Sequence, residues 1–337
     1  MTAPYLYDAN VLLRGEQTAY GTPNPTPTAL LGNVSEITKT PEWEVSDSQK
    51  RQGTIAPSSS ANITKVASSA SIEVANETFE DANYWLDSLF SKATSAGASA
   101  PFSRTYEAPT STAPQPAFMT TLFGQHGLWV QMPDATVATL QITADSNGGV
   151  NFSASLIGGA IKYLSTDTVP TLPIRDNQTE MTGCKSVVSI DAWDGTMGAT
   201  PIELTAFSYG LTINSNRETR GYLGACGAAA IADKKWSGEL TISLEANETS
   251  KAYLDEMFGG DGNEMLKKQI QIKHIEGSGA DLKEFTIQFT GFTKSAPTLF
   301  TDRDGITSYD LVFSGVYNSA FGNWLNILTK CGVETLV

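Results

Sequence analysis

One short sequence motif occurs twice in this chain. Residues 75–78 read Ala75-Asn76-Glu77-Thr78, and the same four residues return as Ala246-Asn247-Glu248-Thr249. Each copy ends an alternating apolar segment, and each is followed by the pattern Leu-Asp-x-apolar-Phe, at 86–90 and at 254–258. Two motifs that recur in the same order indicate an internal repeat.

Three looser matches extend this repeat over most of the chain. Residues 18–23 resemble 196–201, residues 51–53 resemble 219–221, and the run after Gly149 resembles the run after Gly305. All five pairs lie 156 to 178 residues apart in a chain of 337 residues. The spacing predicts a duplicated domain, with the first copy in residues 1–180 and the second in residues 181–337.

The boundary is expected in residues 165–183, a polar stretch that contains Pro170 and Pro173. Residues 94–117 are richer in Ser, Thr, Ala and Pro, and by composition alone they would make the better linker. However, segments on both sides of 94–117 have counterparts within the second copy. We therefore interpret 94–117 as a long loop inside the first domain.

Period-two alternation of apolar residues predicts a mainly β fold with half-buried strands. In the second half the alternating positions are Phe207, Tyr209, Leu211 and Ile213; Leu240, Ile242, Leu244 and Ala246; Phe285, Ile287 and Phe289; Tyr309, Leu311 and Phe313. In the first half they are Ile72 and Val74; Leu128, Val130 and Met132; Val150, Phe152, Ala154 and Leu156. The intervening residues are mostly polar, so one face of each strand should meet a core and the other water or a partner.

One short helix is predicted in each half. Thr78 and Asp81 have capping-box spacing, and an apolar stripe follows at helical spacing. The stripe consists of Phe79, Ala82, Leu86, Leu89 and Phe90. The second helix should cover 249–258 and turn Tyr253, Leu254, Met257 and Phe258 inward.

The composition argues against nucleic-acid binding, metal sites and catalysis. The chain carries 36 Asp and Glu against 22 Lys and Arg, a net charge of −14, which disfavours tight binding of nucleic acid. Three cysteines without a C-x-x-C pair and two distant histidines give no disulfide framework, zinc cluster or His-based catalysis. The Gly-rich run 221–227 lacks the phosphate-binding pattern, and Asp302, Asp304 and Gly305 only begin a calcium loop. We expect no enzyme, cofactor or metal.

The sequence also gives no sign of membrane insertion. The longest mainly apolar run, 223–232, is too short to span a bilayer, and the first 15 residues lack the basic region of a signal peptide. We therefore expect a soluble protein made inside the cell, with reduced thiols.

The order of predicted parts resembles the tail tube proteins of long-tailed bacteriophages. The resemblance lies in the strand-then-helix segments 72–90 and 242–258 and in the Gly-bounded strands 148–159 and 305–315. It implies two tandem β-sandwich or partial-barrel domains, each with one flanking helix, as in tail tubes with duplicated domains. Three chains would then build a ring with pseudo-sixfold symmetry.

The resemblance also implies a location and partners. The protein would be assembled in the host cytoplasm and reside in the virion tail, where its rings stack into a conduit for genome ejection. Its partners would be further copies of itself, a tape-measure protein and a tail terminator. Double-stranded DNA would pass through without tight binding. Charges of −8 in residues 1–180 (17 acids, 9 bases) and −6 in the remainder (19 acids, 13 bases) would give the conduit an acidic wall.

Ring stacking in this family points to the long loop between the first two strands of each domain, here 46–62 and 214–236. The residues predicted to contact the next ring are Lys50, Arg51, Gln52, Arg217, Arg220 and Tyr222. The alternative interpretation of the cations among them is ordinary solvated loop charge.

Other functions stay open at this point. Tandem β-domains with exposed aromatic residues also bind glycans, as carbohydrate-binding or adhesin modules, and Trp43, Trp129, Trp193 and Trp236 would be the candidates. A tail terminator, distal tail or sheath-like protein is a further alternative. A β-rich hydrolase would require a polar cluster that the sequence does not suggest.

Overall fold

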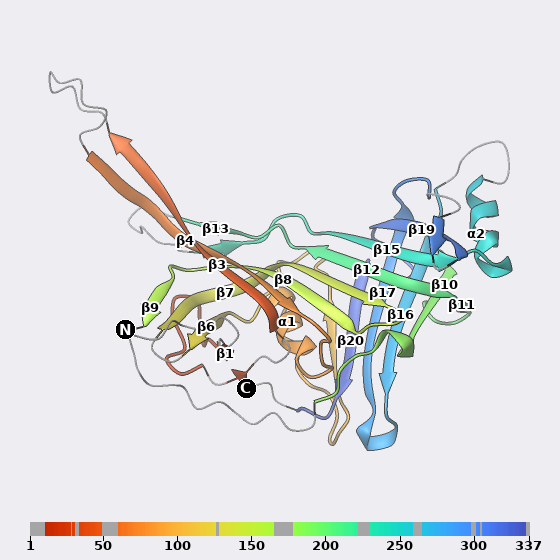
Figure 1. Ribbon diagram of the computed structural model, residues 1–337, viewed down its shortest axis with the longest axis horizontal. Coiled ribbons are helices and arrows are strands. Elements are labelled where there is room, and N and C mark those ends of the chain that lie inside the picture. Colours follow the sequence, from red (N-terminus) through yellow and green to blue (C-terminus); the bar gives the residue numbers. More distant parts are fainter. Residues whose placement is uncertain are drawn as a thin grey trace.

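The computed structural model describes most of the chain, and the described part is mainly β, as predicted. It covers residues 11–27, 29–30, 34–48, 60–125, 128–164, 178–221, 230–258, 265–297, 301–303 and 305–334. Within these ranges there are two α-helices, α1 (Ala82–Leu89) and α2 (Glu248–Phe258). The molecule is elongated, with a long hairpin projecting from one end and α2 near the other (Figure 1).

Strands of the first half pair in a defined order. They are β1 (Val11–Glu16), β2 (Ala29–Leu30), β3 (Val34–Ser48), β4 (Ser60–Val74), β5 (Phe102–Glu107), β6 (Met119–Gln125), β7 (Leu128–Asp145), β8 (Val150–Gly158) and β9 (Lys162–Leu164). Antiparallel pairing gives the order β2-β1-β6-β7, continues from β7 through β8 and β4 to β3, and adds β9 to β7.

Strands of the second half pair in the corresponding order. They are β10 (Ser186–Ala192), β11 (Ile202–Leu204), β12 (Ala206–Asn214), β13 (Glu218–Arg220), β14 (Ala230–Ala232), β15 (Ser237–Glu245), β16 (Lys267–Glu276), β17 (Lys283–Thr293), β18 (Thr301–Arg303), β19 (Ile306–Gly315) and β20 (Leu325–Cys331). The order is β11-β10-β16-β17, continues from β17 through β19 and β15 to β12, and adds β20 to β17. Two 3-10 turns, η2 (Gly183–Lys185) and η3 (Gly279–Asp281), lie between strands.

One strand pair joins the two halves into a continuous sheet. β12 pairs with β7 in antiparallel register from Ser208 opposite Asp145 to Asn214 opposite Thr139. The sheet therefore runs β3-β4-β8-β7-β12-β15-β19-β18, and Figure 1 shows β12 and β15 lying along β7 and β8. We call this pairing the internal joint.

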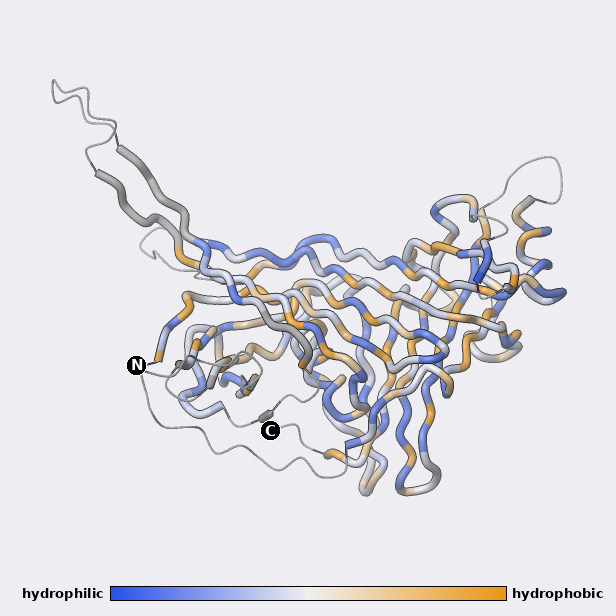
Figure 2. Tube along the Cα trace, in the orientation of Figure 1, coloured by the Kyte–Doolittle hydropathy of each residue, from blue (hydrophilic) through white to orange (hydrophobic). Residues whose placement is uncertain are grey.

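The hydrophobic core lies against one face of this sheet. Leu140 and Ile142 of β7, Leu211 of β12 and Ile242 of β15 are all 0% exposed. Their neighbours along each strand are polar, so hydrophilic and hydrophobic residues alternate along the trace in Figure 2. Burying one face of each strand fixes its register, because a shift by one residue would turn the apolar side chains to the solvent.

Both predicted helices exist, with different caps. The predicted stripe on and beside α1 is buried, from Phe79 to Phe90. The Thr78 hydroxyl accepts the Asp81 N–H at 3.1 Å, so this contact stabilises the turn before the helix, which starts at Ala82. In α2, Asn247 Oδ1 accepts the Ser250 N–H at 3.0 Å and Ser250 Oγ accepts the Asn247 N–H at 2.9 Å, a reciprocal capping box.

The sequence predicts a loop for the segment 94–117, but this segment also contains a strand. It contains β5, which pairs with β20 near the other end of the chain, from Phe102 opposite Cys331 to Glu107 opposite Asn326. Alternation in Phe-Ser-Arg-Thr-Tyr-Glu is too short to stand out from the surrounding Ser- and Pro-rich sequence. A part of the first half thus extends a sheet of the second.

Candidate assembly surfaces

The face of the continuous sheet that points away from the core is polar. It forms a hollow of about 550 Å³ across the internal joint, and we call it the polar face. Its lining includes Gln141, Thr143, Asp145, Asn151, Ser208, Thr212, Glu239, Thr241, Ser243, Arg303 and Asp310. Hydroxyl and amide groups dominate, and its charged members are mainly acids. Such a face can contact water or a polyanion without binding it tightly.

Ion pairs hold the basic residues at this face. Arg303 binds Asp145, and Lys294 Nζ lies 2.5 Å from Glu239 Oε2. Arg303 also donates to Ser208 Oγ at 3.0 Å, and its guanidinium lies 5.2 Å from the ring of Phe207. Asp310 is exposed on β19. Arg303, the cation among the lining residues, is thus matched by a carboxylate, and the lining residue Glu239 is paired with Lys294.

The two border strands of the sheet have open outer edges. Among the described strands, β3 pairs only with β4 and β18 pairs only with β19. β3 contains Pro41, which lacks a backbone N–H, and sheets tolerate proline mainly on edge strands. Unpaired edges of this kind are templates for pairing with another chain.

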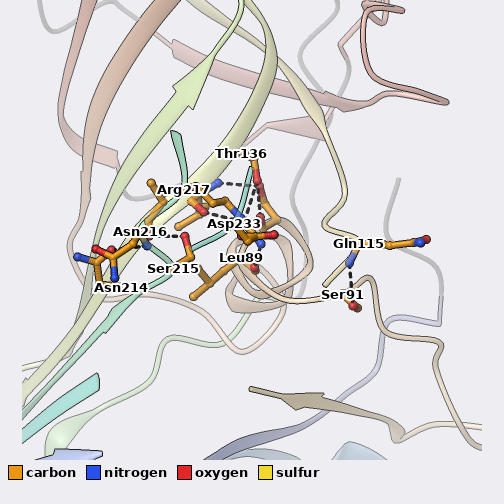
Figure 3. A network of polar contacts seen from close by, with 12 residues as sticks. Leu89, Ser91, Gln115, Thr136, Asn214, Ser215, Asn216, Arg217 and Asp233 are labelled. Carbon is orange, nitrogen blue, oxygen red and sulfur yellow. Dashed lines mark hydrogen bonds and ion pairs between the residues drawn. The ribbon is translucent and has the colours of Figure 1, made fainter. Parts of the chain in front are cut away.

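A buried arginine clamps the second half onto the first (Figure 3). Arg217 lies after β12, where the chain leaves the internal joint, and its side chain is 0% exposed. Its guanidinium donates to the carbonyl oxygens of Ser88 (2.9 Å), Val137 (2.8 Å) and Leu89 (2.5 Å), and to Thr136 Oγ1 (3.0 Å).

The charge of this arginine is balanced at the opposite side. Asp233 Oδ1 lies 2.5 Å from Arg217 Nε, and the Trp236 ring lies 5.6 Å from the guanidinium carbon. Burial lowers the pKa of Arg217, and Asp233 opposes that shift. Because the last turn of α1 leaves carbonyl groups without helical partners, a cation there satisfies acceptors that would otherwise be buried unpaired.

Further contacts connect the halves around the joint. Lys283 Nζ of β17 lies 2.6 Å from Glu80 Oε1, and the rings of Phe152 and Phe285 lie 5.9 Å apart. Ser215 donates to the Ala138 carbonyl from both its N–H (2.9 Å) and its hydroxyl (2.8 Å). Strand pairing, packing and charge pairs therefore act together at one interface.

A buried histidine links two layers of the second half. His274 of β16 has its Nε2 2.7 Å from the Tyr209 hydroxyl and its Nδ1 2.9 Å from Ser186 Oγ. Burial lowers the pKa of His274 to about 4, partly offset by a backbone hydrogen bond at Thr182. The imidazole is therefore neutral at pH 7 and serves as a structural bridge between β12 and β10.

The residues predicted for ring stacking lie in different places. Lys50, Arg51, Gln52 and Tyr222 fall outside the described residues. Arg220 is the exposed residue of β13, and its guanidinium is 2.9 Å from Glu218 Oε1. Arg217 is buried within the chain, as described above. Sequence spacing alone could not separate these two arginines, since they are three residues apart on one hairpin.

The tryptophans proposed for glycan binding are not gathered on an exposed surface. Trp129 is 1% exposed, and Trp236 packs with its ring 5.4 Å from that of Phe90. Trp193 is half-buried, and its carbonyl accepts side-chain amides of Gln269 and Asn318. The side chain of Trp43 lies outside the described residues. These positions favour packing over sugar binding.

The described residues show neither a metal-binding cluster nor a membrane-spanning helix. They contain no group of three or more His, Cys, Asp or Glu that could hold a metal ion. In the same part of the chain, neither helix combines the length and the apolar character that crossing a membrane requires.

Comparison with known proteins identifies the family. A search of curated proteins found no match. The family model described as "Phage tail tube protein" matches residues 8–315, which include both border strands, the internal joint and the polar face. The chain therefore belongs to the phage tail tube protein family, whose members are structural components of the virion tail.

Proposed function

We propose that this protein is the repeating subunit of a phage tail tube, in which three chains close into a ring and rings stack into a conduit for the genome. The observation that carries this proposal is the internal joint. There β12 of the second half completes the edge of β7 of the first, so the chain already contains one side-by-side contact between two similar sheets.

The repeated pairing order supports two tandem tail-tube domains, in residues 1–180 and 181–337. Each strand of β2-β1-β6-β7-β8-β4-β3 has a counterpart in β11-β10-β16-β17-β19-β15-β12, and an α-helix, α1 or α2, follows the corresponding hairpin in each half. A ring of six such domains needs only three chains. The open borders β3 and β18 would meet between neighbouring chains.

The polar face supports a role as the lumen wall. Its hydroxyl, amide and carboxylate side chains lie on the side of the sheet opposite the core, and the whole chain carries a net charge of −14. A wall with few unpaired cations repels the phosphate backbone, so DNA can pass without being held.

Ring stacking is proposed through the two long hairpins. In Figure 1 the β3–β4 hairpin and the end of the second hairpin at β13 extend toward the same end of the molecule. Arg220 is exposed on β13, and the basic residues Lys50 and Arg51 lie between β3 and β4 in the sequence. Many weak contacts of this kind, repeated around a ring, would join one ring to the next. A tape-measure protein and a terminator are the further partners proposed.

Purified protein tests the proposal directly. We expect negative-stain images at raised concentration to show rings or tubes, and the mass of the smallest ring to equal three chains. Compact monomers under all conditions would contradict the tube, whereas six chains per ring would contradict only the duplicated-domain ring. A low copy number per virion would instead indicate a terminator or distal tail protein.

A further inference from the structure

We propose that Glu36 on β3 of one chain lies opposite Arg303 on β18 of the next, in the register that Ser208 and Asp145 take at the internal joint. This inference rests on the proposed function, since it specifies how the borders of neighbouring chains meet. It assigns the partner of each border strand as a second copy of this chain.

The first step is the correspondence between the β7–β8 turn and the β18–β19 turn. Ala144 pairs with Val150, and Asp302 pairs with Thr307. In each case a glycine, Gly148 or Gly305, lies two residues before the second member of the pair. Asp145 and Arg303, which directly follow Ala144 and Asp302, therefore occupy corresponding positions.

The same alignment sets the positions two residues earlier. Thr143 pairs with Asn151 and Thr301 pairs with Ser308. Thr143 of the internal joint thus corresponds to Thr301 of the open border. These two strand ends are identical in residue type at this position.

The second step is the correspondence between β3 and β12. Ile72 of β4 pairs with Ala154 of β8, and Ile242 of β15 pairs with Leu311 of β19. Ala154 and Leu311 each lie three residues after the partners of Thr143 and Thr301, so Ile72 and Ile242 correspond.

The hairpin pairing then places β3. Ile37 pairs with Ile72, and Tyr209 pairs with Ile242. Ile37 therefore corresponds to Tyr209. The residues beside them follow, so Glu36 corresponds to Ser208 and Thr38 to Gly210.

The third step transfers the joint to the chain borders. Ser208 lies opposite Asp145 at the internal joint, and this pair becomes Glu36 opposite Arg303 between chains. Gly210 lies opposite Thr143, and this pair becomes Thr38 opposite Thr301. This correspondence follows from strand pairing alone, without regard to charge, yet it places the acid Glu36 opposite the base Arg303. Directly opposed side chains in an antiparallel pair are close enough to interact.

Charge also disfavours the neighbouring register. A shift of one residue along β18 sets Glu36 opposite Asp302, which brings two carboxylates together. Like charges directly opposite each other destabilise strand pairs. The charges therefore favour one register between β3 and β18 of neighbouring chains. Glu36 attracts Arg303 in the proposed alignment and repels Asp302 in the alignment shifted by one residue.

Arg303 is available for this exchange. Its side chain is 31% exposed in the single chain, and its ion-pair partner Asp145 is 49% exposed. Exposed ion pairs contribute little to stability, so one carboxylate can replace another at small cost. In the assembled ring Arg303 exchanges both Asp145 and the Ser208 hydroxyl for Glu36, because β12 lies three strands inside β18 and Glu36 would lie beyond its outer edge.

Four double-cysteine variants test the register in assembled particles, in a chain with Cys184→Ser and Cys226→Ser. Two pairs are in the proposed register, Glu36→Cys with Arg303→Cys and Thr38→Cys with Thr301→Cys. Two pairs are displaced, Glu36→Cys with Thr301→Cys and Thr38→Cys with Arg303→Cys. Each substitution occurs once in each set, so effects on folding are shared between the sets.

After mild oxidation, denaturing gels without reductant show whether chains are joined. We expect the two in-register pairs to give covalent dimers and trimers at least fivefold more abundant than those of the displaced pairs. Equal or greater cross-linking by the displaced pairs, or no cross-link from any pair in particles that imaging shows as rings, overturns the register but leaves the tube intact. Failure of the parent chain to form rings overturns the proposed function itself.

Discussion

At the scale of single residues, Arg217 makes the largest set of contacts described above between the two halves. Replacing it with alanine removes the partner of Asp233 and one hydrogen-bond donor from each of the carbonyls of Ser88, Leu89 and Val137. We expect a loss of about 3 to 5 kcal/mol in the free energy of unfolding, because breaking a buried charge pair costs that much. Urea unfolding of the unassembled protein measures the loss.

Arg220 provides the matched control. It is three residues away on the same hairpin, but its side chain is 49% exposed and its ion pair with Glu218 lies in solvent. Arg220→Ala should change the free energy of unfolding by less than about 1 kcal/mol. Equal losses for the two variants would show that Arg217 is not the clamp described here.

His274 gives a second residue-scale prediction, on pH. Because its pKa is about 4 in the folded protein and about 6.5 when unfolded, the unfolded state binds more protons between these values. Stability contributed by neutral His274 is therefore present above pH 6.5 and is lost as the pH falls toward 4. The loss should reach about 3 kcal/mol, at 1.36 kcal/mol per pKa unit.

The variant His274→Gln isolates this contribution from that of the carboxylates. We expect it to be less stable than the parent at pH 7, and the difference between the two to shrink as the pH falls to 4. Chemical denaturation at a series of pH values measures the difference. A difference that stays constant with pH would mean that His274 is not held neutral by burial.

At the scale of elements, the close approach of a tryptophan to two strands makes glycine necessary. Trp324 lies against Gly238 of β15 and Gly315 of β19, and a Cβ at Gly315 would lie 2.6 Å from its ring. A Cβ at Gly238 would overlap the same ring. We expect Gly238→Ala to destabilise the fold by about 1 to 3 kcal/mol through overpacking, measured by thermal or urea unfolding.

Gly210 on β12 is the control for this element. A Cβ there would meet only Thr143 Cγ2, at 3.7 Å, which is an ordinary contact. Gly210→Ala should leave stability within about 0.5 kcal/mol. The interpretation fails if Gly210→Ala is as damaging as Gly238→Ala, or if Trp324→Leu does not relieve the effect of Gly238→Ala.

Some of the strands could be predicted from the sequence and others could not. Strands with large apolar residues on one face, such as β15 and β19, were predicted from alternation, because burial of one face writes a period of two into the sequence. β16 alternates as well, through Ile270, Ile272 and His274, but its polar positions are long charged and amide side chains and we did not predict it. β5 was missed because its alternation covers only six residues within a Ser- and Pro-rich stretch, and its pairing with β20, more than 200 residues away, leaves no local signal.

The candidate site was predictable in kind but not in position. Composition indicated an acidic, non-catalytic surface, whereas the pairing of β7 with β12 is a tertiary contact that no local pattern encodes. Arg217 illustrates the limit. In sequence it is a loop cation beside Arg220, and only the carbonyls at the end of α1 distinguish it.

At the scale of the whole molecule, the polar face predicts how tubes treat DNA. Asp310 lies exposed on this face, so Asp310→Lys should place a ring of cations along the conduit. We expect assembled tubes of this variant to retain short duplex DNA in a nuclease-resistant form at low salt and to release it as salt rises. Glu203→Lys, at an exposed position of β11 that is not among the lining residues, makes the same charge change and should protect no DNA.

In the proposed ring, one chain supplies two adjacent sheets, and further copies complete their borders. An averaged image down the axis of an assembled tube tests this arrangement most directly. We expect a hollow ring of six similar domains contributed by three chains, with the polar face of β7, β12 and β15 toward the hole. Six complete chains around the axis, or a ring with this face turned outward, would contradict it.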